Sequence, residues 1–448
     1  MQIDDTFAVG VVDLCVKRGA TAAEVVLREE TEFAVGIRLG QIETLTEAGS
    51  RALGIRALID GRQASVSTSD FSADAIDALV DEAIALASAT SVDESADVPD
   101  RSEMAEDLPD LELYDPALAE LSADAKIDMA VRCERAALDV DPRIVNSDRG
   151  GLNTTIGTTR FANSLGFAGS YRTTSISLSA VPVARDGDEM QRDHWYDVRR
   201  SLAALEAPES IGRKAADRTL RRLGARKVAS CEAPVVFDPA IARDLLGTIF
   251  QAASGDAIYR KASMFADQLG ERVAVQGLTV VDDGRVPRGS GSRPFDGEGL
   301  ATRRTTVMRD GVLESFLLNT YTGRKLGRPS TGNATRGVVG QPGVGPGNLF
   351  IEPGSTTRDE IIRSVGRGFL VTELMGFGVN IVNGDYSRGA AGLWIENGEV
   401  AYPVEEVTIA GNLKDMLLGI DAIGSDLEFR GRMGAPTLLI CRMAISGR

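Results

Sequence analysis

The chain of 448 residues contains a single histidine, His194. Its four cysteines, Cys15, Cys133, Cys231 and Cys441, are spread over the whole length and form no C-x-x-C pair. Zinc sites, Ser/His/Asp hydrolases and Cys/His proteases depend on imidazole, either as a metal ligand or as a base with a pKa near neutrality. With one imidazole, most hydrolytic mechanisms are closed to this chain when it acts alone.

His194 lies in the polar and aromatic segment Asp193–Tyr196, where it could carry a proton or bind a ligand at a domain edge. No catalytic triad can be assembled around it, and a lone histidine is more often a structural hydrogen-bonding residue. A metal site made only of carboxylates, such as Asp256, Glu373 or Asp385, stays open, but no spacing selects these residues. We therefore predict no catalytic residue and no metal ligand in this chain.

The charge balance is acidic. The 65 Asp and Glu residues outnumber the 49 Lys and Arg residues, for a net charge of −16. This balance disfavours nucleic acid or an anionic membrane as a primary partner. The first residues, Met1–Asp5, carry acids where a signal peptide carries positive charge, and no apolar run approaches the roughly 18 residues of a membrane span. We expect a cytoplasmic protein whose cysteines are buried free thiols.

Hydrophobic periodicity predicts a first domain over residues 1–227. Alternating apolar residues in Phe33–Leu39 and Leu53–Ile59 predict an antiparallel meander. Helices are predicted over residues 4–18, after Ser72, after Ser122 and over residues 208–223. The segment 91–117 holds ten acids and three prolines, a composition that predicts a long, solvated connection.

Residues 228–448 change to short apolar runs with the hairpin signals Asp283-Gly284, Asp310-Gly311 and Asn397-Gly398. Helices are predicted after Asp238 and after Thr357, where Glu360 completes a capping box. The glycine-rich stretch 340–347 lacks a phosphate-binding pattern, and we predict a shaped surface loop. The chain is thus predicted to be α+β, with an N-terminal antiparallel sheet carrying helices and a C-terminal strand-rich domain that curls into a barrel-like or sandwiched sheet.

Five phrases in the second domain resemble the TldD/PmbA family and, within it, the PmbA (TldE) branch. They are Ser254–Ser263, Leu317–Gly327, Ser330–Ala334, Asn383–Gly392 and Ile409–Leu417. Their order and spacing cover most of the domain, and the meander and helices predicted for the first domain agree with the family.

The resemblance implies a cytoplasmic subunit that pairs with a TldD-type chain to form a metallopeptidase for small or unfolded peptides. In the TldD-type partner, a helix before the Gly-Asp of the second domain carries a His-Glu-x-x-x-His signature that binds zinc. The matching positions here are Leu246, Gly247 and Gln251, which are unfit as ligands. A further cysteine ligand of the partner has no counterpart, because Cys441 lies in an apolar run and is expected in the core.

The resemblance therefore implies a metal-free subunit that is inactive alone, with zinc in the partner. Asp385, Tyr386 and Arg388 are predicted to line a peptide-binding cleft from a loop, although an internal turn held by its own hydrogen bonds fits the segment equally well. Two other functions stay open. One is a non-catalytic homodimeric protein that binds peptides or regulates, and the other is a hydrolase that uses His194 or a carboxylate-bound metal.

Overall fold

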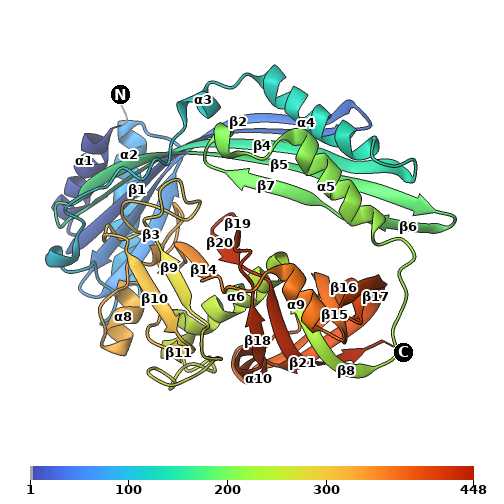
Figure 1. Ribbon diagram of the computed structural model, residues 1–448. Helices are drawn as coiled ribbons and strands as arrows, with labels where there is room; N and C mark the ends of the chain where they lie inside the picture. Colours follow the sequence, from blue (N-terminus) through green and yellow to red (C-terminus); the bar gives the residue numbers. More distant parts are fainter. Residues whose placement is uncertain (1–3, 448) are drawn as a thin grey trace.

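The computed structural model describes residues 4–447, arranged as two strand-rich halves whose inner sides face each other (Figure 1). The N-terminal half is built on a seven-stranded sheet in the order β3-β2-β1-β4-β5-β6, with β7 also paired to β5. All of these pairings are antiparallel, as predicted. The strands are β1 (Ala22–Arg38), β2 (Gln41–Ile59), β3 (Arg62–Thr68), β4 (Ile144–Asn163), β5 (Ala168–Asp186), β6 (Glu189–Arg192) and β7 (Trp195–Arg199).

Two pairs of helices cover one face of this sheet. They are α1 (Asp5–Lys17) with α2 (Ala73–Ala89), and α4 (Ala123–Leu138) with α5 (Pro208–Leu220). Alternate residues of a strand point to the same face, so one face of β1 can contact both pairs of helices. Val25 and Leu27 belong to the core under α1 and α2, and Phe33 and Val35 belong to the core under α4 and α5. The four helices predicted for this half are confirmed.

The opposite face of the sheet looks toward the C-terminal half (Figure 1). Over residues 173–180 of β5, the residues of the helix-covered face are buried, whereas those of the inner face are half-buried and polar. The inner-face residues in this part of the sheet include Asn153, Thr155, Thr173, Ser175, Ser177 and Ser179. Short hydroxyl and amide side chains are therefore frequent on the face of the sheet that looks toward the C-terminal half.

The C-terminal half contains a closed β-barrel. The strand pairs run β17-β16-β15-β8-β21, and β21 pairs back to β17, while β18 continues the sheet beyond β21. This confirms the predicted barrel-like domain. The strands are β8 (Cys231–Phe237), β15 (Arg367–Met375), β16 (Asp385–Glu396), β17 (Glu399–Asn412), β18 (Ile420–Ile423) and β21 (Leu438–Ser446).

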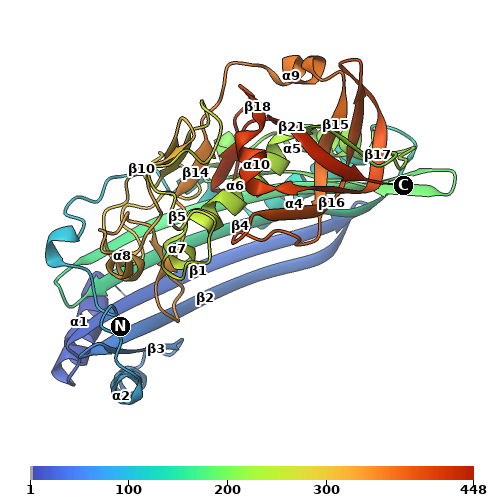
Figure 2. The same ribbon diagram turned by 90° about the horizontal axis from the view of Figure 1, so that it is seen from below.

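A second sheet, in the order β11-β10-β9-β14-β20-β19, lies beside the barrel, nearer the α1 and α2 end of the molecule (Figures 1 and 2). Its strands are β9 (Val280–Asp283), β10 (Arg304–Arg309), β11 (Val312–Leu313), β14 (Asn348–Ile351), β19 (Glu428–Arg430) and β20 (Met433–Ala435). The helices of this half are α6 (Pro239–Ala253), α7 (Gly255–Tyr259), α8 (Thr320–Leu326), α9 (Arg358–Ser364) and α10 (Leu413–Leu418). The predicted starts of α6 and α9 are confirmed, including the Thr357 and Glu360 capping box.

Two of the three predicted hairpins are confirmed. Asp310-Gly311 joins β10 to β11 and Asn397-Gly398 joins β16 to β17, in each case with both residues at positive φ. The prediction at Asp283-Gly284 is wrong, because β9 pairs with β10 only after the long segment 284–303. A side chain at position 284 would collide with Thr302, 2.6 Å away, so this glycine permits close packing rather than a tight turn.

Residues 91–117, named the strap here, are not the solvated connection that their acidity predicted. Ala96, Val98, Ala105, Leu111 and Leu113 are buried. Much of the strap lies against the C-terminal half, where its Asp93 accepts hydrogen bonds from the Tyr321 hydroxyl (2.8 Å) and the Lys325 ammonium (2.9 Å). The strap includes a short 3-10 helix (Arg101–Glu103) and ends within the first turn of α3 (Pro116–Ala119). Its scattered apolar residues and its ion pairs hold the strap against both halves.

The cysteines also differ from the prediction. Cys15 and Cys133 are buried free thiols, but Cys231 is half-buried and Cys441 is exposed. Cys441 lies on β21, whose pairing register shifts between Ile440 and Met443 and turns the side chain outward.

Among the helices within residues 4–447, none combines the length and the apolar character that a bilayer crossing requires. The predicted division of the chain at residue 228 falls in the segment between α5 and β8. We retain this boundary as a proposal.

Candidate functional site

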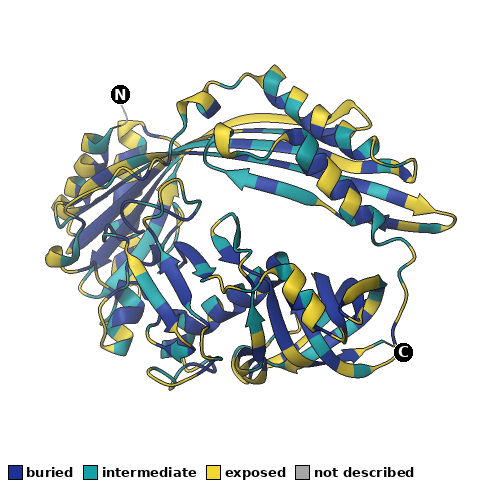
Figure 3. Ribbon diagram, in the orientation of Figure 1, coloured by how far each residue is buried: buried dark blue, intermediate teal, exposed yellow. Residues whose placement is uncertain are grey.

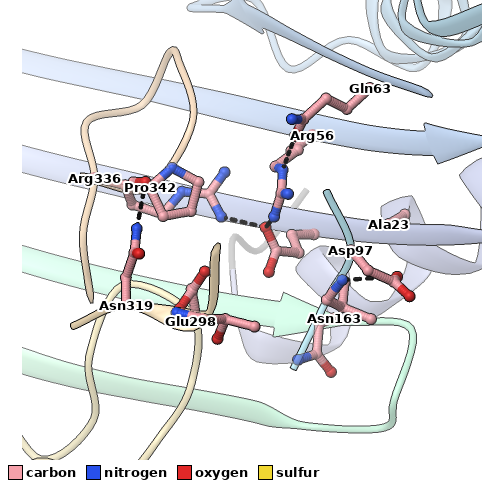
Figure 4. A network of polar contacts seen from close by, with 12 residues as sticks. Ala23, Arg56, Gln63, Asp97, Asn163, Glu298, Asn319, Arg336 and Pro342 are labelled. Atoms are coloured by element: carbon pink, nitrogen blue, oxygen red, sulfur yellow. Dashed lines mark hydrogen bonds and ion pairs between the residues drawn. The ribbon is translucent and has the colours of Figure 1, made fainter. Parts of the chain in front are cut away.

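The two halves are joined by a buried ion triad. Glu24 of β1 is fully buried, and its Oε2 atom accepts from Arg56 Nη1 at 2.9 Å and from Arg336 Nη1 at 2.8 Å. Arg56 lies directly across from Glu24 on β2, whereas Arg336 comes from the loop between the short strands β12 (Ala334–Thr335) and β13 (Gly343–Val344). Arg56 and Arg336 thus approach one carboxylate from the two halves (Figure 4).

The triad keeps Glu24 ionised. Burial alone would raise the pKa of Glu24, but the Arg56 and Arg336 guanidiniums outweigh burial, and the pKa is lowered. The same loop is held a second time, because Arg28 Nη2 donates to the Arg336 carbonyl at 2.6 Å. At Gly54 of β2, an added Cβ would lie 1.7 Å from the Val338 carbonyl oxygen, so only glycine lets the loop approach this closely. The glycine-rich stretch 340–347, predicted as a surface loop, therefore begins just after the residues Arg336 and Val338 that contact the N-terminal half.

Glu24→Ala should lower the free energy of unfolding by about 3–5 kcal/mol, because it leaves two buried guanidiniums without a counter-charge. Urea unfolding measures this loss. The control is Glu43→Ala on the same sheet, where the Arg38–Glu43 pair is exposed and its loss should change stability by only about 0–1 kcal/mol. Equal effects of the two substitutions would contradict the role assigned to the triad.

Three more carboxyls are buried in the C-terminal half. Asp296 accepts from the backbone N–H groups of Glu298, Leu300 and Ala334 at 2.9, 3.1 and 3.0 Å. Glu298 accepts from the Thr320 backbone N–H at 2.9 Å, and burial, together with the nearby charges of Asp296 and Glu24, raises its pKa to about 8. Burial raises the pKa of the third carboxyl, Asp282, to about 6. With a pKa of about 8, Glu298 is mostly protonated at neutral pH and orders its loop without needing a cation.

Glu298→Gln should remove part of the pH dependence of stability. The pKa of Glu298 rises from an ordinary 4.5 to about 8 on folding. Between these values the folded state keeps a proton that the unfolded state releases, so the free energy of unfolding falls as pH rises, by up to about 1.4 kcal/mol per pH unit. Glutamine keeps the acceptor and cannot ionise. Urea unfolding from pH 5 to 8 should give a flatter curve for the variant, and parallel curves would refute the assignment.

Within residues 4–447, no three His, Cys, Asp or Glu side chains are grouped so that they could hold a metal ion. Helix α6 shows why at the positions matched to the zinc-binding helix. Leu246 is fully buried in the core of the C-terminal half, Gly247 has no side chain and Gln251 is exposed. Asp238 caps the helix by accepting from the Ala240 N–H at 3.1 Å. Helix α6 is thus a packing element.

Asp385, Tyr386 and Arg388 begin strand β16 and do not form the loop that the sequence predicted. Arg388 Nη1 lies 3.0 Å from Asp244 Oδ2 on α6. Tyr386 is buried, and its hydroxyl has no hydrogen-bond partner among the residues that the structure describes. Burial, followed by the charge of Asp244, raises the pKa of Tyr386. The exposed Asp385 is held in a local turn with Asn383, which fits the alternative interpretation of an internal turn. That these side chains bind peptide stays a prediction.

His194 lies at the surface, with its side chain 59% exposed. Its ring stacks on Tyr196 with 5.9 Å between ring centres, and its backbone N–H donates to Asp193 at 2.7 Å. The acidic neighbour of His194 is thus Asp193. These contacts include no serine or cysteine that the imidazole could activate.

A cavity of about 780 Å³ opens where the strap passes the edge of β5. Residues 108–114 of the strap form one wall, and Thr158, Arg160, Tyr171 and Arg172 contribute to the other. The Arg172 guanidinium lies 3.7 Å from the centre of the Tyr114 ring. This volume is in the range of sites that hold small ligands or short peptide segments.

Three family models match the chain in order along the sequence. They are described as PmbA/TldA metallopeptidase domain 1 (residues 23–87), central domain (residues 116–223) and C-terminal domain (residues 230–447). The metalloprotease PmbA of Escherichia coli O157:H7 is 40% identical over 426 residues, which cover 95% of this chain and 92% of the relative. This chain belongs to the PmbA/TldD family.

Solved structures of similar proteins share the fold along the whole chain. A Bacteroides thetaiotaomicron protein, whose name describes a modulator of DNA gyrase, has a TM-score of 0.92 at 30% identity and full coverage of both chains. The TldE protein of Thermococcus kodakarensis has a TM-score of 0.88 at 23% identity, covering 98% of this chain and 100% of that one. At that identity, the TldE structure supports the PmbA/TldD fold alone.

The sequence did not reveal the ionic groups between the halves. Glu24 carried a signal, because it is an acid inside the apolar run Ala22–Leu27 of a predicted strand. Arg336 carried none, because a basic residue in a glycine-rich segment is ordinarily solvated.

Proposed function

We propose that this chain is the metal-free subunit of a two-subunit metallopeptidase of the PmbA/TldD family. In the cytoplasm it would pair with a TldD-type chain that holds zinc and would help to form the chamber in which small or unfolded peptides are cleaved. The observation that carries the proposal is helix α6, where Leu246, Gly247 and Gln251 offer no zinc ligand. Zinc does not fit this helix, and no catalytic step is assigned to this chain.

Peptide handling is supported by the face of the sheet that looks toward the C-terminal half. The polar inner face of β4 and β5 presents hydroxyl and amide groups, which can hydrogen-bond a peptide of any sequence. The cavity beside the strap adds aromatic and cationic groups, among them Tyr114 and Arg172. These groups suit binding and orientation rather than bond cleavage.

The isolated chain should not cleave an unstructured peptide, and a mixture with a TldD-type subunit should cleave it in a chelator-sensitive manner. His194→Ala and Gln251→Ala in this chain should leave the activity of the mixture unchanged within about twofold, because neither side chain is assigned to the chemistry. Fluorogenic peptide cleavage measures both results. Metal-dependent cleavage by the isolated chain would overturn the proposal.

Pairing with another chain is supported by the open edge of β2. Strand β3 pairs only with Leu53–Ile59 of β2, so residues 41–52 have no strand partner on that side within residues 4–447. Residues 41–51 are exposed, including the apolar Ile42 and Leu45 (Figure 3). A long exposed strand edge is a template for pairing with another strand. Because Glu43 and Glu47 lie on it, we assign it to a strand of the TldD-type partner that carries lysine or arginine.

The double substitution Ile42→Lys and Leu45→Lys should weaken assembly with the TldD-type subunit by at least about tenfold, because it adds positive charge to the pairing edge. Analytical ultracentrifugation measures the dissociation constant. The control is Leu418→Lys, since Leu418 on α10 is 51% exposed, close to the 54% of Leu45. Unchanged assembly of the double variant would exclude this edge as the interface, and self-association of the wild-type chain alone would favour a homodimer.

A further inference from the structure

A group of arginines gathers where α5, β7, α6, α9 and β19 meet, at the second junction between the halves. Four of them have acidic partners. The pairs are Arg218–Asp193 at 3.3 Å, Arg358–Asp238 at 3.1 Å, Arg222–Glu373 and Arg430–Glu428. The Arg222–Glu373 pair joins the end of α5 to β15 of the barrel. These pairs use four acids of the junction for four of its arginines.

Two further arginines of the same group, Arg221 and Arg243, have no ion pair within residues 4–447. The charged neighbours of Arg221 include Asp193, Asp238 and Arg358, and those of Arg243 include Asp238, Glu428 and Arg430. Each of these acids is thus already the ion-pair partner of another arginine. Two guanidinium charges are left in excess at one place in a chain with a net charge of −16.

The excess charge is partly desolvated. Nε and Nη2 of Arg221 and Nη1 of Arg243 are buried and have no hydrogen-bond partner among residues 4–447. Burial, followed by the charge of Arg218, lowers the pKa of Arg221 to about 10. Each arginine is half-buried as a whole, so other parts of both side chains reach the surface. Buried donors without acceptors are costly, and a guanidinium pair of this kind is complementary to a carboxylate or a phosphate.

The surroundings hold the group in place. The Arg430 guanidinium lies 3.7 Å from the centre of the Trp195 ring, and the Arg218 guanidinium lies 5.3 Å from the same ring. Asp238 is both the partner of Arg358 and the N-cap of α6, the helix that carries Arg243. A fixed arrangement of donors binds an anion with a smaller loss of conformational entropy than mobile surface side chains do.

We propose that Arg221 and Arg243 form a subsite that binds a carboxylate of the peptide, with the free C-terminus as its principal source. This inference rests on the proposed function, because it assumes that peptides enter the space between the halves. It adds a substrate class to that function, namely short peptides with an unblocked C-terminal carboxylate. Each guanidinium offers two parallel N–H donors to the two carboxylate oxygens, which an amide cannot match.

Isothermal titration calorimetry of the full-length chain with four probes tests the proposal. The probes are N-acetyl-tetraalanine with a free C-terminus, its C-terminal amide, an amidated peptide of the same length with one internal aspartate, and inorganic phosphate. The free acid should bind at least about tenfold more tightly than the amide. A comparable gain for the internal aspartate would keep carboxylate recognition and extend its source to side chains. Equal affinities for acid and amide, or binding of phosphate alone, would overturn the proposal.

Arg221→Gln and Arg243→Gln should each weaken binding of the free acid by roughly tenfold and leave binding of the amide unchanged. The matched control is Arg309→Gln on β10, where an exposed arginine pairs with Glu314 at 2.9 Å. Arg221→Lys keeps the positive charge but not the two parallel N–H donors, so it should weaken binding of the free acid by an intermediate factor. This variant provides a test if a glutamine variant does not fold. Variants that bind the acid as tightly as wild type would overturn the proposal. Chelator-sensitive cleavage of an amidated peptide by the assembled complex reports the proposed function separately.

Discussion

The rest of the structure depends on the carboxylate of Glu24, which is shared by Arg56 of its own sheet and Arg336 of the opposite half. A fully buried carboxylate is tolerated only with its counter-charges in place, so the contact is directional as well as strong. It fixes the loop that also packs on Gly54, and the neutral Glu298 beside it orders the next loop without adding another charge. The position of the C-terminal half below the sheet follows from these contacts.

The two junctions between the halves differ in their charge balance. At the triad, one acid holds two arginines, and the neighbouring Glu298, with its raised pKa of about 8, takes up a proton. At the junction near Trp195, four ion pairs leave Arg221 and Arg243 without an ionic partner in the described part of the chain. The chain thus concentrates its buried ionic groups where the halves meet, while α6 at the centre of the C-terminal half is packed with apolar residues. This distribution is compatible with the proposed role, in which the subunit would bind peptide and a partner would supply the chemistry.

Local chemistry allowed much of the fold to be predicted from sequence. Asp238-Pro239 starts α6 and Asn397-Gly398 turns the β16–β17 hairpin because a cap or a turn depends on a few adjacent residues. The strap was mispredicted because its Asp93 pairs with Tyr321 and Lys325, which lie more than 200 residues away in the sequence. Cys441 was mispredicted because a register shift in β21 cannot be seen in an apolar run. The pairings of Glu24 and the excess of Arg221 likewise exist only after the halves have met.

The central claim is that this chain belongs to a zinc-dependent peptidase without holding the zinc. Elemental analysis of the chain purified alone and of its complex with a TldD-type subunit tests this most directly. The account predicts no stoichiometric metal in the isolated chain and one zinc ion per pair of subunits in the complex. One tightly held zinc ion per isolated chain would contradict it, and would mean that carboxylates of this chain bind metal after all.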